Sequence, residues 1–222
     1  MKQRAYIYTT VAGVLLAAFL ILTVLLTCVD VRAAGESGAE VGFATLNEAV
    51  FDALGQNELC LKASELCGIL MLAAVGAFGV TGFVQVIRRK GILRADPELY
   101  VMAGGLVLLA AVYVLFEIVV INCRPVLDEG ELAASYPSSH TMLAVAVAGM
   151  GMAYLQIRAK KGALAYTLYG LPNVASVATV VLRLLSGVHW LTDIVGGVLL
   201  GLVITFVYLA VCTYMAHKKE CV

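Results

Sequence analysis

The sequence predicts an all-α, polytopic membrane protein: one domain over residues 1–222, with six transmembrane helices in a bundle. Three observations predict this fold class. The 222 residues are 62% hydrophobic with a mean hydropathy of +0.95, well above a typical soluble domain. Six apolar stretches each approach the roughly 20 residues that cross a bilayer as a helix. Clusters of Lys and Arg follow alternate stretches, as expected of cytoplasmic loops.

The first span is expected at residues 6–27, after Lys2 and Arg4. This apolar run is longer than the roughly 7–15 residues of a signal-peptide core. Leu25-Leu26-Thr27-Cys28 resembles a lipoprotein cleavage site, but threonine is a poor residue before the cysteine, so we expect an uncleaved helix. The other spans are expected at residues 60–87, 99–122, 137–157, 164–185 and 190–215.

Prolines and glycines mark particular places in these spans. Pro137 occupies the favoured first position of the fourth helix, and Pro172 should kink the fifth. Gly197 and Gly201 form a pair four residues apart in the sixth span. Such pairs favour close packing between membrane helices.

Residues 29–58 form an acidic polar segment between the first two spans. Its first half carries three glycines and is typical of a loop. Residues 46–54 then show helical spacing, with Leu46, Val50, Phe51 and Leu54 on one face. We expect a short amphipathic helix lying on the membrane surface. This helix either only covers the bundle or also contributes to substrate entry.

Basic residues set the predicted orientation, because they precede the first span and follow the second, fourth and sixth: Lys2, Arg4, Arg88, Arg89, Lys90, Arg94, Arg158, Lys160, Lys161, Lys218 and Lys219. The positive-inside rule makes this side cytoplasmic, with both termini. We therefore expect a plasma-membrane protein with its acidic first loop outside. Cys28, Cys60 and Cys123 fall near span ends on that outer side, a placement that allows a disulfide.

The expected partners follow from the same composition. The formal net charge is zero, which gives no indication of a nucleic-acid partner. The lipid bilayer is the expected surrounding, and no feature of the sequence predicts an oligomeric state.

Ionisable residues gather at the outer ends of four spans. Arg124 ends the third span, His140 opens the fourth, Arg183 closes the fifth and His189 opens the sixth. Ionisable residues at membrane depth indicate a functional site. A single histidine there is equally well explained as a polar cap, but two histidines with two arginines on one side favour a site.

His189 and Asp193 are four residues apart and so share a helical face. A carboxylate in this position fixes the tautomer of the imidazole and stabilises its positive charge. We expect His189 to attack phosphorus as a neutral imidazole. His140 would protonate the leaving oxygen and then activate water.

The remaining residues suit a phosphate rather than a metal ion. Arginine offers a planar fork of N–H donors, so Arg124 and Arg183 are expected to hold phosphoryl oxygens. A helix that begins at Pro137 presents free N–H groups from its first turn, which form a favourable phosphate cradle. This turn is the expected substrate-binding segment and comprises Pro137, Ser138, Ser139 and His140. The acidic residues of the 123–136 loop have the spacing of solvent-facing charges, not of cation ligands.

These motifs resemble the signature of the type 2 phosphatidic acid phosphatase (PAP2) superfamily, which also includes the vanadium haloperoxidases. That signature reads K-x6-R-P, P-S-G-H and S-R-x5-H-x3-D. Its counterparts here lie within residues 60–205 and are Arg124-Pro125, Pro137-Ser138-Ser139-His140 and Arg183-x5-His189-x3-Asp193. The resemblance implies no metal or cofactor. It also implies a role for each site residue. His189 would be the nucleophile, Asp193 its partner and His140 the general acid. Phosphate would be bound by Arg124, Arg183 and Ser138.

The sequence departs from that signature at three positions. Leu182 stands in place of the serine before the arginine, Ser139 in place of the glycine, and Glu117 in place of the first lysine. On a continuous helix, Glu117 would lie two turns, about 10 Å, from Arg124 on the same face.

Three interpretations of Glu117 compete. It pairs with Arg124, Arg183 or Lys62 and shapes the pocket; it meets a cationic group on an unusual substrate; or it marks weak or lost phosphatase activity. A further hypothesis is that Lys62 replaces the missing lysine.

The function that best fits these residues is a metal-independent phosphatase acting on lipid phosphates or polyprenyl diphosphates at the outer membrane surface, through a phosphohistidine. The alternative is a lipid-phosphate binding or transport protein of the same fold with weak or no catalysis. Glu117 favours this alternative, whereas the two intact histidines disfavour it. A haloperoxidase-like oxidase using vanadate fits the membrane architecture poorly.

Overall fold

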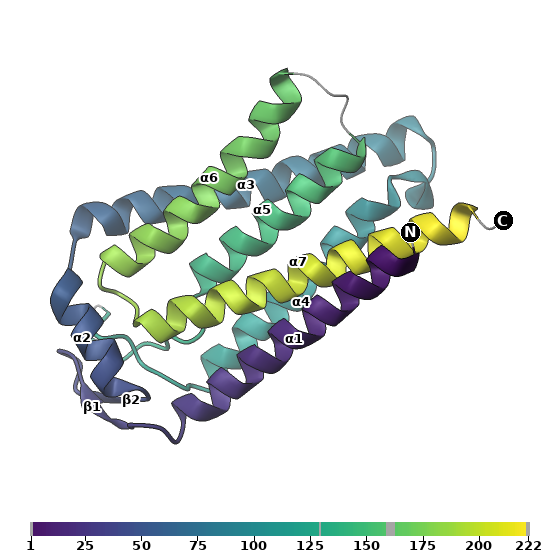
Figure 1. The fold of residues 1–222 in the computed structure, drawn as a ribbon. Helices are drawn as coiled ribbons and strands as arrows, with labels where there is room; N and C mark the ends of the chain where they lie inside the picture. Colours follow the sequence, from purple (N-terminus) through teal and green to yellow (C-terminus); the bar gives the residue numbers. More distant parts are fainter. Residues whose placement is uncertain (1, 129, 159–162, 221–222) are drawn as a thin grey trace.

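The structure, a computed structural model, describes residues 2–128, 130–158 and 163–220. Its long helices run side by side (Figure 1). Five are long and apolar enough to cross a membrane: α1 (Lys2–Leu26), α3 (Glu58–Arg88), α4 (Pro97–Ile118), α5 (Ser139–Arg158) and α7 (Leu191–Glu220). In α6 (Ala163–Leu185) a shorter apolar stretch, Gly170–Leu185, is described. The chain is therefore an integral membrane protein of the predicted helical class.

The expected spans were approximate, and two of their limits differ from the structure near the site. The third span was expected to reach residue 122, but α4 ends at Ile118 and Asn122 lies in the following loop. Hydropathy does not register this end, because residues 119–121 are as apolar as the helix before them. The fourth helix begins at Ser139, and Pro137 precedes it after a cis peptide bond with Tyr136.

The packing of α7 brings the starts of two helices together. It lies against α1 and α5, while α6 packs on both α5 and α3 (Figure 1). A Cβ atom on Gly197 would lie 2.7 Å from the Ser138 carbonyl oxygen, and one on Gly201 would lie 2.7 Å from the Val145 Cβ. The close packing predicted for this glycine pair is therefore confirmed, and it places the start of α5 beside the start of α7. Pro172 lies inside α6, which continues through it.

A small cap, residues 29–57, covers one end of the bundle (Figure 1). It contains an antiparallel hairpin that was not expected, β1 (Arg32–Ala34) with β2 (Ala39–Val41). The helix predicted at 46–54 is confirmed as α2 (Ala44–Leu54). Its inward face differs from the apolar face of the sequence, because Leu46 and Leu54 are exposed while Asn47 is buried. The cap packs on the bundle through an apolar cluster that comprises Ala34, Val41, Ala44, Phe51 and Trp190.

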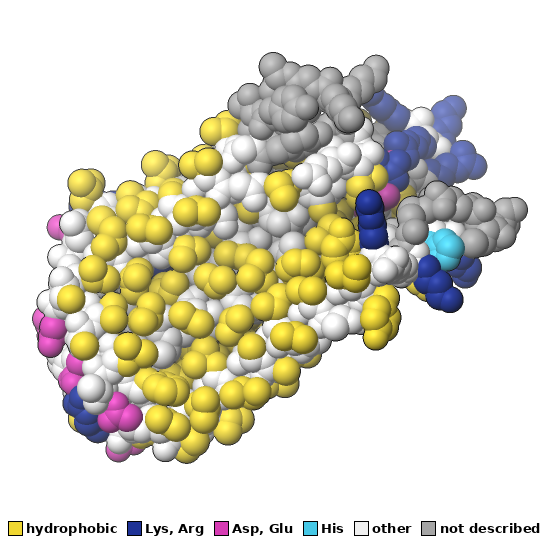
Figure 2. All heavy atoms as spheres, in the orientation of Figure 1, with side chains coloured by type: hydrophobic (Ala, Val, Ile, Leu, Met, Phe, Trp, Pro, Cys, Tyr) yellow, Lys and Arg dark blue, Asp and Glu magenta, His cyan; other side chains and the backbone are white. Residues whose placement is uncertain are grey.

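Charge separates the two ends of the molecule. Figure 2 shows a largely apolar flank, acidic side chains at the cap end, and Lys and Arg gathered at the end that holds the termini. Beyond α3 lies a short 3-10 helix, η1 (Ile92–Arg94). The exposed basic residues at this end include Lys2, Arg4, Arg88, Arg89, Lys90, Arg94, Arg158 and Lys218. Lys160 and Lys161, which were predicted to join them, lie outside the described residues.

The outer-side cysteines do not pair. Cys28, Cys60 and Cys123 are free thiols, so the disulfide that their sequence positions allowed is not present among them. Burial raises the pKa of the Cys123 thiol, and the nearby Asp193 carboxylate adds to this effect. Cys123 is therefore held in its protonated, unreactive form.

Candidate active site

A polar cavity of about 570 Å³ lies at the cap end, between α3, α5, α6 and the loop that follows α4. Arg124, His140 and Arg183 line it together, from three separate segments of the chain. His189 lies next to it, with its Nε2 atom 3.5 Å from Nη2 of Arg183. The four residues that were expected to converge are thus brought together.

His189 and Asp193 are both buried behind this cavity. Nδ1 of His189 lies 3.6 Å from Oδ2 of Asp193, just beyond hydrogen-bond length. The opposite ring nitrogen, Nε2, faces Arg183. Burial lowers the pKa of His189 below its ordinary value, although Asp193 works against the shift. The imidazole is therefore neutral at physiological pH, with one nitrogen toward the carboxylate and the other toward the cavity side.

Arg183 is almost fully buried, with only 3% of its surface exposed. Its Nη1 donates to the Ser64 hydroxyl over 3.3 Å, whereas its Nε has no acceptor among the described residues. A buried N–H without an acceptor calls for a ligand or a water. Ser64 of α3 was not predicted, because nothing in its sequence surroundings distinguishes it. It supplies Arg183 with a hydroxyl contact, whereas the family's own serine position holds Leu182.

Arg124 follows α4 in the loop and already has one anionic partner. Its Nη1 lies 2.8 Å from Oδ2 of Asp128, which is half exposed. The expectation that the loop acids face solvent is therefore incomplete, because Asp128 pairs with a predicted phosphate ligand. The Nε of Arg124 is buried and has no acceptor in the described chain, so Asp128 does not satisfy all the donors of this guanidinium group.

The turn before α5 is only partly available as a phosphate cradle. Ser138 donates its backbone N–H to the Asp193 carbonyl over 3.0 Å, so this donor ties α5 to α7 instead. Its carbonyl accepts from Met142, which makes Ser138 the cap of the helix. Pro137, just before it, is buried. Ser139 and His140 begin the helix, where N–H groups lack intrahelical acceptors.

The His140 ring is held against a glycine. A Cβ atom on Gly68 of α3 would lie 2.9 Å from Cδ2 of His140 and 3.4 Å from its Nε2. A side chain at position 68 would therefore displace the ring. Gly68 was missed in the sequence because one glycine inside an apolar helix carries no distinctive signal.

Glu117 and Lys62 lie outside this cavity. The helix that was expected to put Glu117 and Arg124 on one face ends between them, so that expectation was wrong. Glu117 is exposed, faces Tyr113 on the preceding turn, and forms no ion pair among the described residues. Lys62 pairs instead with Glu58 over 2.7 Å and is largely exposed. Neither residue lines the cavity with Arg124 and Arg183.

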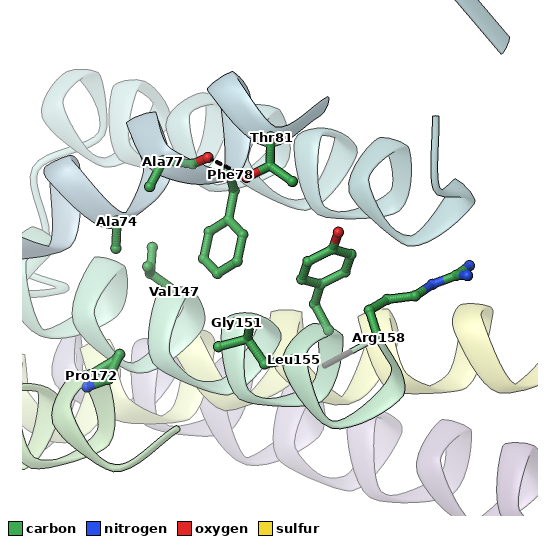
Figure 3. A pocket seen from close by; sticks show the side chains of 10 residues that line it. Ala74, Ala77, Phe78, Thr81, Val147, Gly151, Leu155, Arg158 and Pro172 are labelled. Carbon is green, nitrogen blue, oxygen red and sulfur yellow. Dashed lines mark hydrogen bonds between the residues drawn. The ribbon is translucent and has the colours of Figure 1, made fainter. Parts of the chain in front are cut away.

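A second cavity, of about 420 Å³, lies between α3, α5 and α6 farther from the cap. It is lined mainly by apolar side chains, and Phe78 points from α3 toward α5 across it (Figure 3). It contains none of the histidines or motif arginines described above. The polar cavity is therefore the candidate active site.

The sequence model of the PAP2 superfamily matches residues 69–217, more than half of the chain. The chain belongs to the PAP2 superfamily. Among solved structures, it is similar to the crystal structure of the first transmembrane PAP2 type phosphatidylglycerolphosphate phosphatase from Bacillus subtilis. The TM-score is 0.61 at 20% sequence identity, over 91% of this chain and 96% of that chain. This likeness shows the shared fold. A comparison with curated proteins gives no match.

The region matched to the PAP2 superfamily contains all three motifs of this chain but not every residue around the cavity. Arg124, His140, Arg183, His189 and Asp193 lie within residues 69–217. The cap, Ser64 and Gly68 precede that region. Ser64 contacts Arg183 and Gly68 lies against His140, so both contacts come from parts of this PAP2 superfamily member outside the match.

Proposed function

We propose that this protein is a metal-independent phosphatase that removes phosphate from a membrane lipid phosphate or diphosphate through a phosphohistidine intermediate. Membership of the PAP2 superfamily and the transmembrane fold support a phosphatase-type function. The observation that carries the proposal is one cavity lined by Arg124, His140 and Arg183, with the His189–Asp193 pair beside it.

The first step is phosphoryl transfer to the protein. The Nε2 lone pair of His189 attacks phosphorus, and the bond between phosphorus and the lipid oxygen breaks. His140 donates a proton to that leaving oxygen. Asp193 stabilises the positive charge that the His189 ring gains, while Arg124 and Arg183 hold the phosphoryl oxygens.

The second step restores the enzyme. His140, now neutral, accepts a proton from a water molecule whose oxygen attacks phosphorus. The bond between nitrogen and phosphorus breaks, which releases inorganic phosphate and returns His189 to its neutral form. Each histidine thus begins and ends the cycle in the same protonation state.

The proposed substrate side is the outer leaflet of the plasma membrane. The cavity lies at the acidic cap end, opposite the Lys- and Arg-rich end that carries the termini (Figures 1 and 2). Basic residues favour the cytoplasmic side of a membrane. A lipid phosphate in the outer leaflet would present its head group at the depth of the cavity.

Phosphate release from a panel of lipids tests this proposal. The purified protein in detergent is given phosphatidic acid, phosphatidylglycerol phosphate, undecaprenyl diphosphate or diacylglycerol diphosphate, with a chelator present. We expect release from at least one lipid, and background release from His189→Ala. Release that is lost with the chelator contradicts metal independence.

A folded wild-type protein that releases phosphate from none of these lipids contradicts catalysis on this substrate class. That result favours the alternative, a lipid-phosphate binding or transport protein. The pairing of Arg124 with Asp128 is the contact that fits this alternative, since a carboxylate already occupies one phosphate donor.

A further inference from the structure

The two carboxylate oxygens of Asp193 have different partners. Oδ2 accepts the backbone N–H of Trp190 over 2.9 Å and lies 3.6 Å from His189. Oδ1 accepts Nδ2 of Asn122 over 3.2 Å. Asp193 has no exposed surface and Asn122 only 1%. Asn122 is therefore a buried side-chain donor on the carboxylate that faces His189.

The orientation of the Asn122 amide is fixed by the cap. Its Oδ1 accepts the N–H of Gly42 over 3.4 Å. Turning the amide over would set its oxygen against the Asp193 carboxylate and its NH₂ group against another N–H. A Cβ atom on Gly42 would lie 2.0 Å from the Leu26 carbonyl oxygen. Only a residue without a side chain therefore fits at this position beside Asn122. The cap thus determines which end of Asn122 meets Asp193.

The backbone of Asn122 is held as firmly as its side chain. The Asn122 carbonyl accepts both the N–H of Ser135, over 2.9 Å, and the Ser135 hydroxyl, over 3.1 Å. Ser135 lies three residues before Ser138, whose N–H donates to the Asp193 carbonyl. The loop after α4 and the start of α7 are therefore joined around one carboxylate.

We propose that Asn122 is a positioning residue for phosphoryl transfer, which holds the Asp193 carboxylate toward His189 and links the cap to that pair. The proposal rests on the proposed role of His189 as nucleophile. A buried carboxylate that keeps all its donors stays ionised and in place. Without the Asn122 donor, Oδ1 is left unpaired, which favours rotation or protonation of the carboxyl group.

Asn47 provides a matched control inside the same cap. It too is 1% exposed. It donates to the Gly42 carbonyl over 2.8 Å and to the Thr192 hydroxyl over 3.0 Å, and it accepts the Thr192 N–H. Asn47 therefore ties the cap to α7 one residue from Asp193, without contacting the carboxylate.

The charged and titratable groups that act on this pair come from several elements. Around Asp193 and His189 they are His140, Cys123, Tyr136, Arg124 and Arg183. Burial raises the pKa of Tyr136 to about 12 and keeps the Cys123 thiol protonated. Neither group changes charge between pH 5 and 8, so a shift of the pH optimum in that range reports the histidines and the introduced carboxyl group.

The test compares Asn122→Asp with Asn47→Asp in the full-length protein, using a lipid that the wild type hydrolyses. Asn122→Asp sets two carboxyl groups side by side, and the introduced one donates to Asp193 only while it is protonated. We expect kcat to fall about 10–100-fold at pH 7, as loss of an orienting partner does at metal sites. KM should change little. The pH optimum should move down by about one unit or more.

We expect Asn47→Asp to lower the melting temperature but to keep the wild-type pH optimum. An unchanged optimum and kcat in folded Asn122→Asp overturn the proposal, as does an equal shift in both variants. If Asn122→Asp does not fold, Asn122→Ser takes its place. A rise in KM at wild-type kcat in that variant contradicts a positioning role.

A spectroscopic measurement separates this proposal from the proposed function. Nitrogen NMR of protein labelled in histidine shows which ring nitrogen of His189 carries the proton, with His189→Ala identifying the signal. We expect the proton on Nδ1 in the wild type and a mixed tautomer in Asn122→Ser. The same tautomer mixture in both proteins overturns the proposal, even when the wild type turns over no lipid.

Discussion

Arg183 places a full positive charge among buried groups. Its Nε has no acceptor within the described chain, and a buried unpaired donor costs on the order of 1–3 kcal/mol. Its Nη1 and Nη2 are directed instead toward Ser64 and His189. An anion that accepts from Nε would relieve this cost, so a bound phosphate is the kind of partner that this residue favours.

The buried position of His189 sets an expected pH dependence. Its pKa is lowered below the ordinary value of 6.5, chiefly by burial. A lowered pKa keeps the imidazole neutral as the pH falls through 6.5, and only the neutral form attacks phosphorus. We therefore expect the acid-side decline of kcat/KM to have its midpoint below pH 6.5, which a pH–rate profile measures, while the proposed need for a protonated His140 sets the alkaline side. An acid-side decline with its midpoint at or above pH 6.5 contradicts this prediction.

Arg124 and Lys62 are expected to differ sharply when replaced. Arg124 lines the cavity, whereas Lys62 is exposed and paired with Glu58. Arg124→Ala should lower kcat/KM on the order of 100-fold, as loss of a transition-state donor does. Lys62→Ala should stay within about 2-fold of the wild type, because the exposed pair is worth little. Equal losses in the two variants would restore Lys62 as a substitute for the missing lysine.

Glu117→Gln tests the position where a carboxylate replaces the lysine of the PAP2 signature. Glu117 is exposed on α4 and does not line the cavity. We expect Glu117→Gln to keep phosphate release within about 2-fold of the wild type, since it removes only an exposed charge. A large gain in activity would show that the carboxylate repels the substrate.

Among the elements, α3 determines where His140 can lie. Gly68 contacts the His140 ring, and Ser64 contacts Arg183 from the preceding turn. One face of α3 thus contacts both His140 and Arg183. Gly76 lies farther along the same helix, with no atom within 4 Å of a Cβ built there.

Gly68→Ala and Gly76→Ala form a matched pair on this helix. The new methyl at position 68 would meet His140 Cδ2 at 2.9 Å, which pushes the ring from its place. A displacement of about 1 Å near reacting atoms costs on the order of 100-fold. We expect that loss of kcat for Gly68→Ala, and wild-type activity for Gly76→Ala. Similar activity in the two variants would mean that His140 can shift without consequence.

Sequence patterns identified the site residues that lie at the spacings of known motifs. They missed the residues whose contacts with the site form only in the folded chain. His189 and Asp193 are four residues apart, and their approach could be predicted from that spacing, although His189 itself precedes the start of α7 at Leu191. Ser64 and Asn122 reach their partners across 119 and 71 residues, and no local pattern marks them. The predicted end of α4 was also misplaced. Hydropathy measures only apolar content, and the helix ends inside a run of apolar residues.

At the scale of the whole molecule, charge and topology agree. The termini and most of the exposed basic residues share one end, and the cap and the cavity share the other (Figures 1 and 2). Exposed Cys28 follows α1 on the cap side. Arg88, also exposed, ends α3 at the basic end. These two positions mark opposite membrane faces.

Labelling in intact cells tests the orientation. In a variant that keeps Cys28 as its single thiol, a membrane-impermeant maleimide should react from outside. With Arg88→Cys as the single thiol, labelling should require permeabilised cells. The reverse pattern would place the cavity on the cytoplasmic side and the positive-inside expectation would be wrong.

Trp190 is the chain's single tryptophan. It is 1% exposed, follows His189 directly, packs against Phe51 of the cap and donates its indole N–H to the Cys123 carbonyl. The tryptophan fluorescence of the whole protein therefore comes from one indole, seated between the cap and His189. Its emission offers an unlabelled optical signal for any event at this site, with inorganic phosphate or a lipid phosphate as the titrant, whether or not turnover follows.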